Sequence, residues 1–464
     1  MILIPNVAGK TFGVVGLGKS GRATVGSLLA SGANIVGWDD GEEARVVAQR
    51  EFPTMTITAV KSWKYSSMRA LVMSPGIMLN HPAVLLAQEH HVEVLGDIEL
   101  LYRARPRARY LTITGTNGKS TTTTLTAHIL KACGKQVEAG GNLGVPALDL
   151  GALDANGLYV LELSSYQLDL VRTTAFQTAM LLNISPDHLD HHGSMENYIA
   201  AKRHIFDRAT KDSVAIIGVD DTITLGICQE MMKAGNQRVI PISARNSLVR
   251  GIYVVDGILH NSLETTPLTA DLRPMRTLQG EHNWQNAAAA YAACWANGCA
   301  HHDIVRAMRT YPGLAHRMQW LGTVDGVQFV NDSKATNADA AEKALKTFDN
   351  IYWILGGREK EGGITSLEQY FPKVRNAYLI GEAAHSFQKT LEGKVKYLQC
   401  NMLSRAFEVA AEDAMRDRLP NAVVLLSPAC ASFDQFANFE LRGEVFAKLF
   451  KELQSTGGGR ASTA

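Results

Sequence analysis

The sequence has little of what marks secreted, membrane-spanning or nucleic-acid-binding proteins. Its six cysteines are scattered over 464 residues without a Cys-x-x-Cys pair, so we expect reduced thiols and neither disulfide bonds nor a zinc site. The net charge is only +1, and no apolar run is long enough to span a bilayer. The first residues, MILIPNVAGK, lack the charged and apolar regions of a signal peptide. These absences predict a cytoplasmic protein that neither binds nucleic acid nor inserts into a membrane.

What the sequence does contain is a recurring alternation of short apolar strands with helix-like stretches. The expected strands are TFGVVG, ANIVGWDD and ALVMSPG, then RYLTIT, GLYVLELSS, QTAMLLNIS and DSVAIIG, a strand-rich stretch over 239–280, and finally VQFVNDS, NIYWILGG, NAYLIGE and AVVLLSP. An Ala-rich helix, HNWQNAAAAYAACWANG, is expected between the second and third groups. This alternation indicates an α/β fold with mainly parallel sheets.

The chain length suggests roughly three domains of about 150 residues each. We place them at residues 1–97, 98–312 and 313–464, and we expect 455–464 to be disordered because that tail has no apolar periodicity. The run LLYRARPRARYL, around residues 97–110, carries four arginines and a proline. It could bind phosphate, but we interpret it as a solvated connector between the first two domains.

A glycine fingerprint follows the first expected strand. Gly16, Gly18 and Gly21 form a G-x-G-x-x-G pattern, and Asp39 ends the next strand 23 positions after Gly16. This spacing is typical of Rossmann dinucleotide sites, in which the acidic residue contacts a ribose hydroxyl. However, a helix N-terminus with closely approaching glycines accepts any diphosphate, including that of a UDP-sugar. The pattern therefore predicts a diphosphate nucleotide without saying which one.

A second glycine turn, YLTITGTNGKST at residues 110–121, has the features of an ATP phosphate loop. Its backbone amides can surround phosphates, Lys119 can reach the β/γ oxygens, and Ser120 can ligate Mg²⁺. It is not a strict Walker A motif, because Gly115 lies four rather than six positions before Lys119. A chance Gly-Lys-Ser turn is the alternative, but the position between a strand and a helix start favours phosphate binding.

Charged residues near two later strands suggest a metal. Glu162 ends the buried strand of YVLELSS, where an unpaired carboxylate is costly, so we expect it to be a second Mg²⁺ ligand alongside Ser120. The cluster Asp187, His188, Asp190, His191 and His192 is compatible with zinc in composition. Its intervals fit no single zinc pattern, so we expect most of these side chains to lie in a solvated loop.

Lys202 lies in an otherwise apolar helical stripe with Met195, Ile199 and Phe206, at intervals of i, i+4, i+7 and i+11. Its ammonium group could extend to water along the surface. A buried lysine with a lowered pKa could instead react with CO₂ and become a carbamate, which adds an anionic oxygen ligand.

The loop GTNGKST resembles the phosphate loop of the Mur ligase and folylpolyglutamate synthetase superfamily, whose members join an amino acid to an acyl phosphate made from ATP. Further similar segments are DHLDHH, AAKRHIF, GEHNWQNAAAA, GLAHR, NDSKATN and SPACASFDQF. The last two resemble the D-glutamate-adding branch. The resemblance covers residues 10–450 and implies a Rossmann-like N-terminal domain for the UDP-sugar, a central P-loop-type ATPase domain with a mainly parallel sheet, and a Rossmann-like C-terminal domain for the amino acid.

The resemblance also implies roles for individual residues. The ATP site would comprise Gly115, Thr116, Asn117, Gly118, Lys119, Ser120, Thr121, Asn286, Arg317 and Asp332. The UDP-substrate site would comprise Gly18, Ser20, Asp39, Asp40, Ser74, Gly76, Asn142, Ser164 and His188. The glutamate site would comprise Thr336, Lys360, Ser432, Phe433 and Phe439. Two Mg²⁺ ions would be held by Ser120, Glu162, His188 and carbamylated Lys202, and the catalytic residues would be Lys119, His188, Lys202, Lys334 and Arg317.

The implied reaction adds D-glutamate to UDP-N-acetylmuramoyl-L-alanine with ATP as co-substrate, a cytoplasmic step of peptidoglycan precursor synthesis. We expect a monomer whose third domain closes when ATP binds. Three alternatives stay open at this point: another ligase of the superfamily that adds L-glutamate or extends folylpolyglutamate, an NAD-linked oxidoreductase built on the first domain, and a nucleotide sensor without catalysis.

Overall fold

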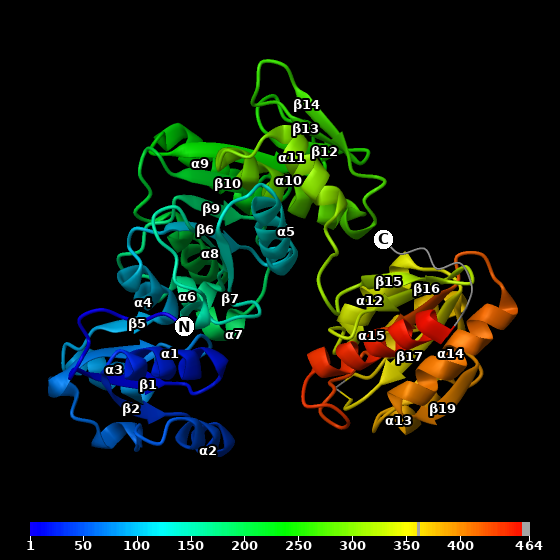
Figure 1. The fold of residues 1–464 in the computed structure, drawn as a ribbon, viewed down its shortest axis with the longest axis horizontal. Coiled ribbons are helices and arrows are strands. Elements are labelled where there is room, and N and C mark those ends of the chain that lie inside the picture. Colours follow the sequence, from blue (N-terminus) through cyan, green and yellow to red (C-terminus); the bar gives the residue numbers. More distant parts are fainter. Residues whose placement is uncertain (360–361, 457–464) are drawn as a thin grey trace. The chain divides into compact units, whose positions relative to one another are not determined.

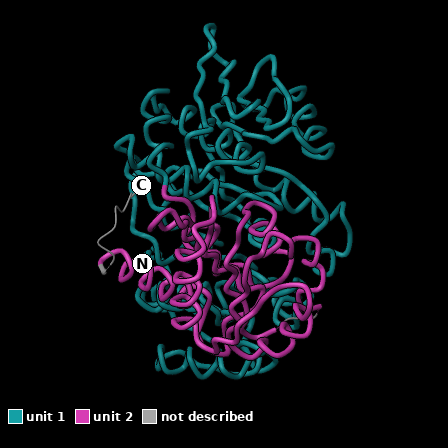
Figure 2. Tube along the Cα trace, turned by 90° about the vertical axis from the view of Figure 1, so that its right-hand side faces the viewer, with its two compact units in different colours: residues 1–311 teal, residues 312–464 magenta. Residues whose placement is uncertain are grey.

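The computed structural model describes residues 1–359 and 362–456, and these form two compact units, Met1–Tyr311 and Pro312–Ala464 (Figure 2). Lys360 and most of the tail that the sequence predicts to be disordered lie outside the described residues. The division into three domains with borders at 97/98 and 312/313 stays a prediction, because the residues of the first two predicted domains form one unit.

Unit 1 begins with a parallel sheet that carries the glycine fingerprint. Its strands and helices are β1 (Thr11–Val15), α1 (Lys19–Ala30), β2 (Asn34–Trp38), α2 (Glu42–Glu51), β3 (Thr56–Ile57), β4 (Met68–Met73), α3 (Pro82–Glu89) and β5 (Val94–Gly96). The strand order is β3-β2-β1-β4-β5, and all pairs are parallel. The strands that the sequence predicts here are confirmed as β1, β2 and β4. The carboxyl ends of these three neighbouring strands meet at one edge, where ligands of α/β sheets bind.

The second sheet of unit 1 carries the phosphate loop (Figure 1). Its strands are β6 (Arg109–Thr114), β7 (Val137–Gly141), β8 (Leu158–Glu162), β9 (Thr178–Leu181), β10 (Val214–Gly218), β11 (Arg238–Ser243), β12 (Ile252–Val255), β13 (Ile258–Asn261) and β14 (Leu268–Asp271). They follow the order β14-β13-β12-β11-β10-β9-β6-β8-β7, and only the β12-β13 and β13-β14 pairs are antiparallel. The predicted strand-rich stretch over 239–280 is confirmed as β11 to β14.

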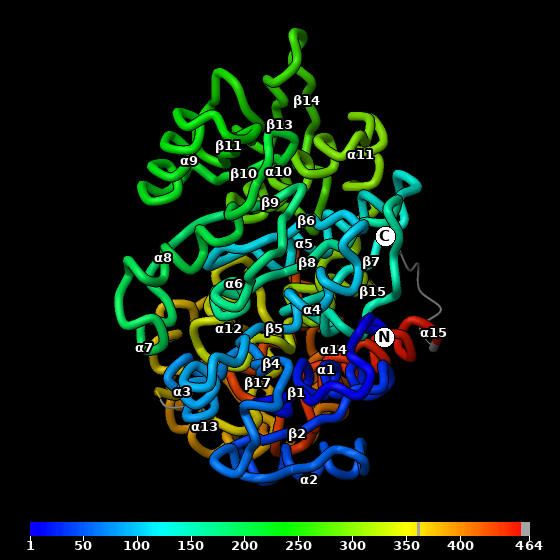
Figure 3. Tube along the Cα trace, turned by 90° about the vertical axis from the view of Figure 1, so that its left-hand side faces the viewer, coloured from blue at the N-terminus to red at the C-terminus, as the bar shows by residue number. Residues whose placement is uncertain are grey.

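Helices surround this second sheet. They are α5 (Lys119–Ala132), α6 (Ser165–Leu168), α7 (Leu189–His192), α8 (Met195–Arg203), α9 (Thr222–Ala234), α10 (Glu281–Ala296) and α11 (His301–Arg309). The predicted Ala-rich helix is α10, and its buried face of small residues packs closely against α5. The helices α6 and α7 both lie next to α8 (Figure 3).

The predicted connector around residues 97–110 is wrong over its first half. Residues Asp97–Ala104 form the helix α4, in which Leu100 and Leu101 are buried. Arg103 pairs with Glu99 and Glu93 instead of projecting into solvent. The four arginines suggested a charged surface. The apolar residues that precede them determine that this segment forms a largely buried helix.

One hydrophobic cluster joins the two sheets of unit 1. It includes Val14 and Leu28 beside the first sheet together with Tyr110 and Leu161 from the second. A backbone hydrogen bond also joins the N-terminal segment to the turn after β7, since the Ile2 amide donates to the Leu148 carbonyl at 2.7 Å. This shared core explains why residues 1–311 form a single compact unit.

Unit 2 is a separate α/β sandwich. Its elements are β15 (Gln319–Val324), β16 (Val327–Asn331), α12 (Ala338–Thr347), β17 (Ile351–Gly356), β18 (Val374–Ile380), α13 (Ala384–Leu391), β19 (Tyr397–Asn401), α14 (Leu403–Asp417), β20 (Val423–Leu426) and α15 (Phe439–Thr456). The strand order is β15-β16-β20-β17-β18-β19, with only β15 antiparallel to its neighbour. The strands that the sequence predicts in this part are confirmed as β16, β17, β18 and β20.

Candidate active site

The glycine turn between β1 and α1 is closed by side chains from the two neighbouring strands. Gly16 has φ +85°, and a Cβ on Gly21 would lie 1.8 Å from the Gly16 carbonyl oxygen, so both positions require glycine. The Ser74 hydroxyl, after β4, donates to that carbonyl at 2.6 Å. From β2, the Asp39 carboxylate accepts from the Leu17 amide at 2.6 Å and from the Gly41 amide at 2.8 Å.

The other residues predicted for the UDP site lie at the same edge of the first sheet. Gly18 and Ser20 begin α1, and space for a Cβ is open at Gly18. Asp40 accepts from the Trp38 indole at 3.0 Å. Gly76 follows Ser74 with φ +96°, again with open space around it. The structure therefore brings the six residues predicted from the first sheet to one edge.

The phosphate loop between β6 and α5 is anchored by Asn183, which follows the strand β9. The Thr116 amide donates to the Asn183 carbonyl at 2.9 Å, and the Asn117 amide donates to the Asn183 side chain at 2.8 Å. Gly118 has φ +83° and precedes the helix directly. The amides of the following residues, Lys119, Ser120 and Thr121, open α5 and have no carbonyl of their own helix to bind, which makes this turn suited to an anion.

Two lysine ammonium groups converge on this loop. Lys119 Nζ donates to the Gly115 carbonyl at 2.8 Å and to the Thr116 carbonyl at 2.9 Å. Lys202 Nζ donates to the same Gly115 carbonyl at 3.0 Å. Lys202 is buried, so the alternative in which it extends to water is wrong. Its burial and the nearby charge of Lys119 lower the pKa of Lys202 to about 7.

Glu162 lies beside the phosphate loop because β8 pairs with β6, with Glu162 opposite Ile113. The side chain is buried, and its Oε1 accepts from the Asn142 amide group at 3.0 Å. Its Oε2 is also buried but has no hydrogen-bond partner among the described residues. Ser164, two residues further on, caps α6 by accepting from the Gln167 amide at 3.2 Å.

Tyr198 connects the loop to the histidine segment, and sequence reasoning missed it. Its hydroxyl bonds Thr116 Oγ1 at 3.1 Å, and the Lys202 ammonium lies 4.6 Å from its ring centroid. The centroid of the His188 ring lies 6.4 Å from the centroid of the same tyrosine ring. The spacing of i and i+4 between Tyr198 and Lys202 on α8 was the available signal. Tyr198 therefore fixes the position of Lys202 beside the loop.

His188 itself is exposed and adopts a left-handed backbone conformation with φ +52° at the start of α7. Asp187 and Asp190 are also exposed, as the sequence predicts for this segment. His192 is the exception. Its side chain is only 4% exposed, and the prediction of a solvated loop is wrong for it because Tyr166 and Tyr198 cover its ring.

Asn286, predicted to contact adenine, is buried under the phosphate loop. Its Oδ1 accepts from the Thr122 hydroxyl at 3.2 Å, and its amide group donates to Asn283 at 3.3 Å. The same Oδ1 would lie 2.2 Å from a Cβ on Gly118. In this arrangement Asn286 supports the loop from behind.

In unit 2, the residues after β16 form a compact polar turn. The buried Asp332 carboxylate accepts from the Met318 amide at 3.0 Å and from the Ser427 hydroxyl at 2.8 Å. Burial raises the pKa of Asp332 to about 7, against the lowering effect of these hydrogen bonds. The Lys334 ammonium lies 5.5 Å from the Phe439 ring centroid. Thr336 is partly exposed at the end of this turn.

The remaining residues predicted in unit 2 are spread between buried and exposed positions. Ser432 is buried, Phe433 is 64% exposed, and Phe439 begins α15. Arg317 is exposed beside His316, whose carbonyl accepts from the Lys334 amide at 2.9 Å. Lys360 lies outside the described residues.

Comparison with known proteins identifies the family. Residues 10–96 match the MurD-like N-terminal domain of Mur ligases, 113–294 the Mur ligase middle domain, and 316–430 the Mur ligase glutamate ligase domain. A protein of Rhodospirillum rubrum named UDP-N-acetylmuramoylalanine–D-glutamate ligase is 48% identical over 464 residues, which cover 98% of this chain and 97% of that protein. The chain belongs to the Mur ligase family. A protein of the same name from Caulobacter vibrioides is 46% identical and is matched over 100% of both chains.

Solved structures of Mur ligases share the fold. The crystal structure of UDP-N-acetylmuramate–alanine ligase from Thermotoga maritima has a TM-score of 0.58 at 16% identity, covering 97% of this chain and 100% of that one. A UDP-N-acetylmuramoyl-L-alanyl-D-glutamate–2,6-diaminopimelate ligase has a TM-score of 0.56 at 18% identity, covering 98% and 94%. The predicted α/β fold, with N-terminal, middle and C-terminal Mur ligase domains and mostly parallel sheets, is confirmed.

The residues of this Mur ligase fit a divalent cation beside the phosphate loop. Glu162 offers a buried carboxylate oxygen with no partner among the described residues, and hard cations such as Mg²⁺ prefer oxygen ligands. The hydroxyl of Ser120 stands on the neighbouring strand-to-helix turn. All six cysteines are free thiols. Among the described helices, none combines the length and apolar composition needed to cross a membrane.

Proposed function

We propose that this Mur ligase joins D-glutamate to UDP-N-acetylmuramoyl-L-alanine, converting ATP to ADP and phosphate, as a step of peptidoglycan precursor synthesis. The relatives that match nearly end to end carry this substrate pair in their name. The observation that supports the chemistry best is the convergence of Lys119 and Lys202 on the Gly115 carbonyl, in a glycine turn that opens a helix.

In the first half-reaction, an oxygen of the alanine carboxylate attacks the γ-phosphorus of ATP, and the bond from that phosphorus to the ADP oxygen breaks. Two anions must approach each other for this step. The amides of Gly118 to Thr121 bind the phosphates, and the Lys119 ammonium offsets charge that develops on the transferred group. The acyl phosphate that results is activated at its carbonyl carbon.

In the second half-reaction, the amine of D-glutamate attacks that carbonyl carbon, loses a proton, and the tetrahedral intermediate expels phosphate. We assign the glutamate site to unit 2, with Thr336, Lys360, Ser432, Phe433 and Phe439. Lys334 and Arg317 carry positive charge that suits both the incoming carboxylates and the departing phosphate. Because Asp332 accepts hydrogen bonds from Met318 and Ser427, we propose that it orders this turn at the place where it would contact the ATP ribose.

The UDP-sugar would bind at the edge of the first sheet, through Gly18, Ser20, Asp39, Asp40, Ser74 and Gly76. Asn142, Ser164 and His188 would contact the remainder of the substrate near Glu162. Two Mg²⁺ ions would be held by Ser120, Glu162, His188 and a carbamylated Lys202, and would neutralise phosphate charge. We further propose that the protein is a monomer and is cytoplasmic, and the free thiols support the second point because they are typical of a reducing compartment.

The carbamate proposal rests on the lowered pKa of Lys202, because only the neutral amine attacks CO₂. Incubation with ¹³C-bicarbonate should give one carbamate resonance in the ¹³C NMR spectrum of the wild-type protein and none in Lys202→Ala. Lys19→Ala serves as the control, since that lysine is exposed at the start of α1 and should leave the resonance in place. A wild-type spectrum without a carbamate signal would contradict the modification but leave the ligase proposal intact.

The test of the reaction is phosphate release from ATP in the presence of UDP-N-acetylmuramoyl-L-alanine, with D-glutamate, L-glutamate or no amino acid, together with the mass of the product. Release that depends on D-glutamate and yields the ligated product is the expected result. If release depends on L-glutamate, the amino acid in the proposal is L-glutamate and not D-glutamate. If activity is found only with a folate acceptor, the acceptor in the proposal is a folate and not the UDP-sugar. Absence of turnover with all acceptors would favour a nucleotide sensor.

A further inference from the structure

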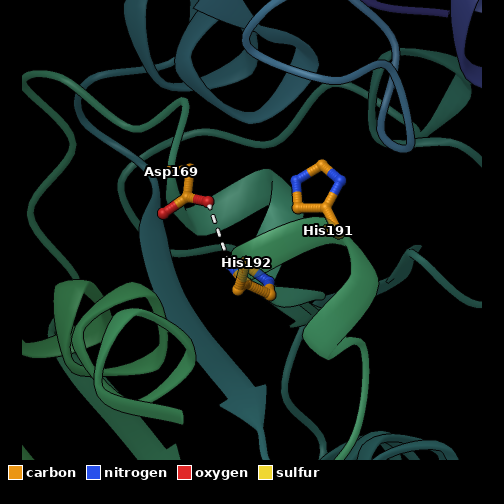
Figure 4. A group of neighbouring side chains, drawn as sticks. All are labelled: Asp169, His191 and His192. Carbon is orange, nitrogen blue, oxygen red and sulfur yellow. Dashed lines mark ion pairs between the residues drawn. The ribbon is translucent and has the colours of Figure 1, made fainter. Parts of the chain in front are cut away.

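A second group of possible metal ligands lies away from Glu162, at the junction of α6 and α7. Asp169 follows α6 directly, and His191 and His192 end α7. One ligand atom from each of the three side chains lies within 4.8 Å of the other two, and Figure 4 shows His192 beside Asp169 with His191 next to them. The sequence singled out both histidines but not Asp169, because the carboxylate comes from 22 positions earlier in the chain.

The spacing between His192 and Asp169 is too long for a hydrogen bond and close to that of two ligands of one ion. His192 Nδ1 and Asp169 Oδ2 are 3.8 Å apart, beyond hydrogen-bond length. Two bonds of about 2.0–2.1 Å that meet at a tetrahedral angle separate their outer atoms by about 3.3 Å. A shift of about 0.5 Å would therefore bring the two atoms to ligand spacing. Within the described residues, no hydrogen bond to the Asp169 carboxylate is found.

The surroundings hold the ligands in place as they do in metal sites. His192 Nε2 bonds the Ser165 hydroxyl at 2.9 Å, which leaves Nδ1 directed at Asp169. Metal-bound histidines commonly fix their second nitrogen in this way. The centroid of the Tyr166 ring lies 4.1 Å from that of the His191 ring and 5.6 Å from that of the His192 ring. The side chains of His192 and Asp169 are only 4% and 17% exposed, so this is not a chance grouping on an open surface.

Another set of two histidines and one aspartate in the same unit shows the contrast. His301, His302 and Asp303 begin α11, and the His302 side chain is 76% exposed. The Nδ1 atom of His301 forms a hydrogen bond with the Tyr291 hydroxyl at 2.8 Å. Among the described residues, only the Asp169 group brings three such ligand atoms together. Composition alone therefore does not produce the site at α6 and α7.

We propose that Asp169, His191 and His192 form a binding site for a divalent transition-metal ion of the Zn²⁺ class. Two imidazoles and one carboxylate suit such an ion better than Mg²⁺, which prefers oxygen ligands. A bound ion would tie α6, which follows Glu162 and Ser164, to α7, which follows His188. The proposal is independent of the ligase reaction, because it concerns binding and not turnover.

The test is a titration of the metal-free full-length protein with Co²⁺, in excess Mg²⁺, followed by the visible absorption of tetrahedrally coordinated Co²⁺. We expect one equivalent to bind in the wild type, Zn²⁺ to displace it, and His191→Ala or Asp169→Asn to weaken binding at least about 10-fold. His302→Ala is the matched control and should bind as the wild type does. Circular dichroism of the metal-free variants checks that they fold.

Two results of the Co²⁺ titration would overturn the proposal. If His188→Ala abolishes the Co²⁺ spectrum while His191→Ala and Asp169→Asn retain it, the ion occupies the predicted Mg²⁺ site instead. If folded wild-type protein binds no Co²⁺ in excess Mg²⁺, the three side chains form only a buried polar contact.

Discussion

The same three residues, Gly-Lys-Ser, begin two helices of unit 1 and serve different ends. Gly18-Lys19-Ser20 opens α1 after β1, and Gly118-Lys119-Ser120 opens α5 after β6. Gly18 has an extended conformation with φ −67°, and Lys19 is exposed. Gly118 has φ +83°, and Lys119 folds back onto the carbonyls of its own loop.

Residues from other parts of the chain that contact each turn cause this difference. In the first turn, Asp39 occupies the Leu17 amide, which places a negative charge where the chain turns. In the second, the loop is anchored by Asn183, and a second ammonium group from Lys202 lies against the Gly115 carbonyl. One turn therefore presents an acid that suits hydroxyl groups, and the other presents the Lys119 ammonium group, which suits phosphates. The comparison teaches that a short motif acquires its chemistry from neighbouring strands.

The largest expected effect distinguishes Lys119 from Lys19, the lysines of the two Gly-Lys-Ser turns. Lys119→Ala should reduce kcat by about 10²–10³-fold, because it removes a cation aimed at charge that develops in the transition state. Lys19→Ala, the matched control at the exposed position, should leave kcat within about twofold. Steady-state phosphate release measures both. Equal losses in the two variants would contradict the distinction drawn between the turns.

The second effect concerns the cost of burying Lys202. Its pKa is 10.5 when exposed and about 7 in the folded protein, so between these values the unfolded chain binds a proton that the folded chain does not. Stability therefore falls as pH drops from about 10 to 7, by about 1.4 kcal/mol per pH unit. Lys202→Met should remove this dependence.

Denaturant unfolding of both proteins in CO₂-free buffer at several pH values measures the difference. The gain in stability of Lys202→Met over the wild type should be greatest at pH 7 and below, and should vanish near pH 10. A constant difference across this range would mean that Lys202 remains charged in the folded protein.

A third, smaller effect tests the backbone conformations. Gly118→Ala should weaken ATP binding roughly 10-fold, because a positive φ costs an L-residue about 1–2 kcal/mol and its Cβ would lie 2.2 Å from Asn286 Oδ1. Gly18→Ala meets open space at φ −67° and should leave ATP binding unchanged. Isothermal titration with an ATP analogue compares the two. Similar affinities would show that the loop tolerates a side chain at both turns.

The smallest expected effect is at the acid of the first turn. Asp39→Asn keeps one acceptor oxygen but loses the charge, and should raise the KM for the UDP-substrate a few-fold, equivalent to about 1 kcal/mol. The KM for ATP should stay as in the wild type, which makes ATP an internal control. A change in the KM for ATP alone would contradict the assignment of this sheet edge to the UDP-substrate.

How much of this was predictable from the sequence depends on the range of the contacts involved. The strands, the two glycine turns and Lys202 as a special residue were visible because local periodicity and spacing encode them. The sequence did not show that α4 is buried, that Tyr198 contacts Thr116, Lys202 and His188, or that Asp169 lies beside His192. These depend on which strands become neighbours, and a single sequence without related sequences carries no direct record of such pairing.

The hydrogen bond between Ile2 and Leu148 has a consequence for synthesis on the ribosome. The first residues of the chain cannot reach their final partners until residue 148 has left the exit tunnel. At about 5–20 residues per second, that delay lasts between roughly 7 and 30 s. During this interval the apolar side chains of Ile2 and Ile4, both buried in the finished protein, lie exposed in the nascent chain. Nascent unit 1 is thus a candidate client for chaperones that act during translation.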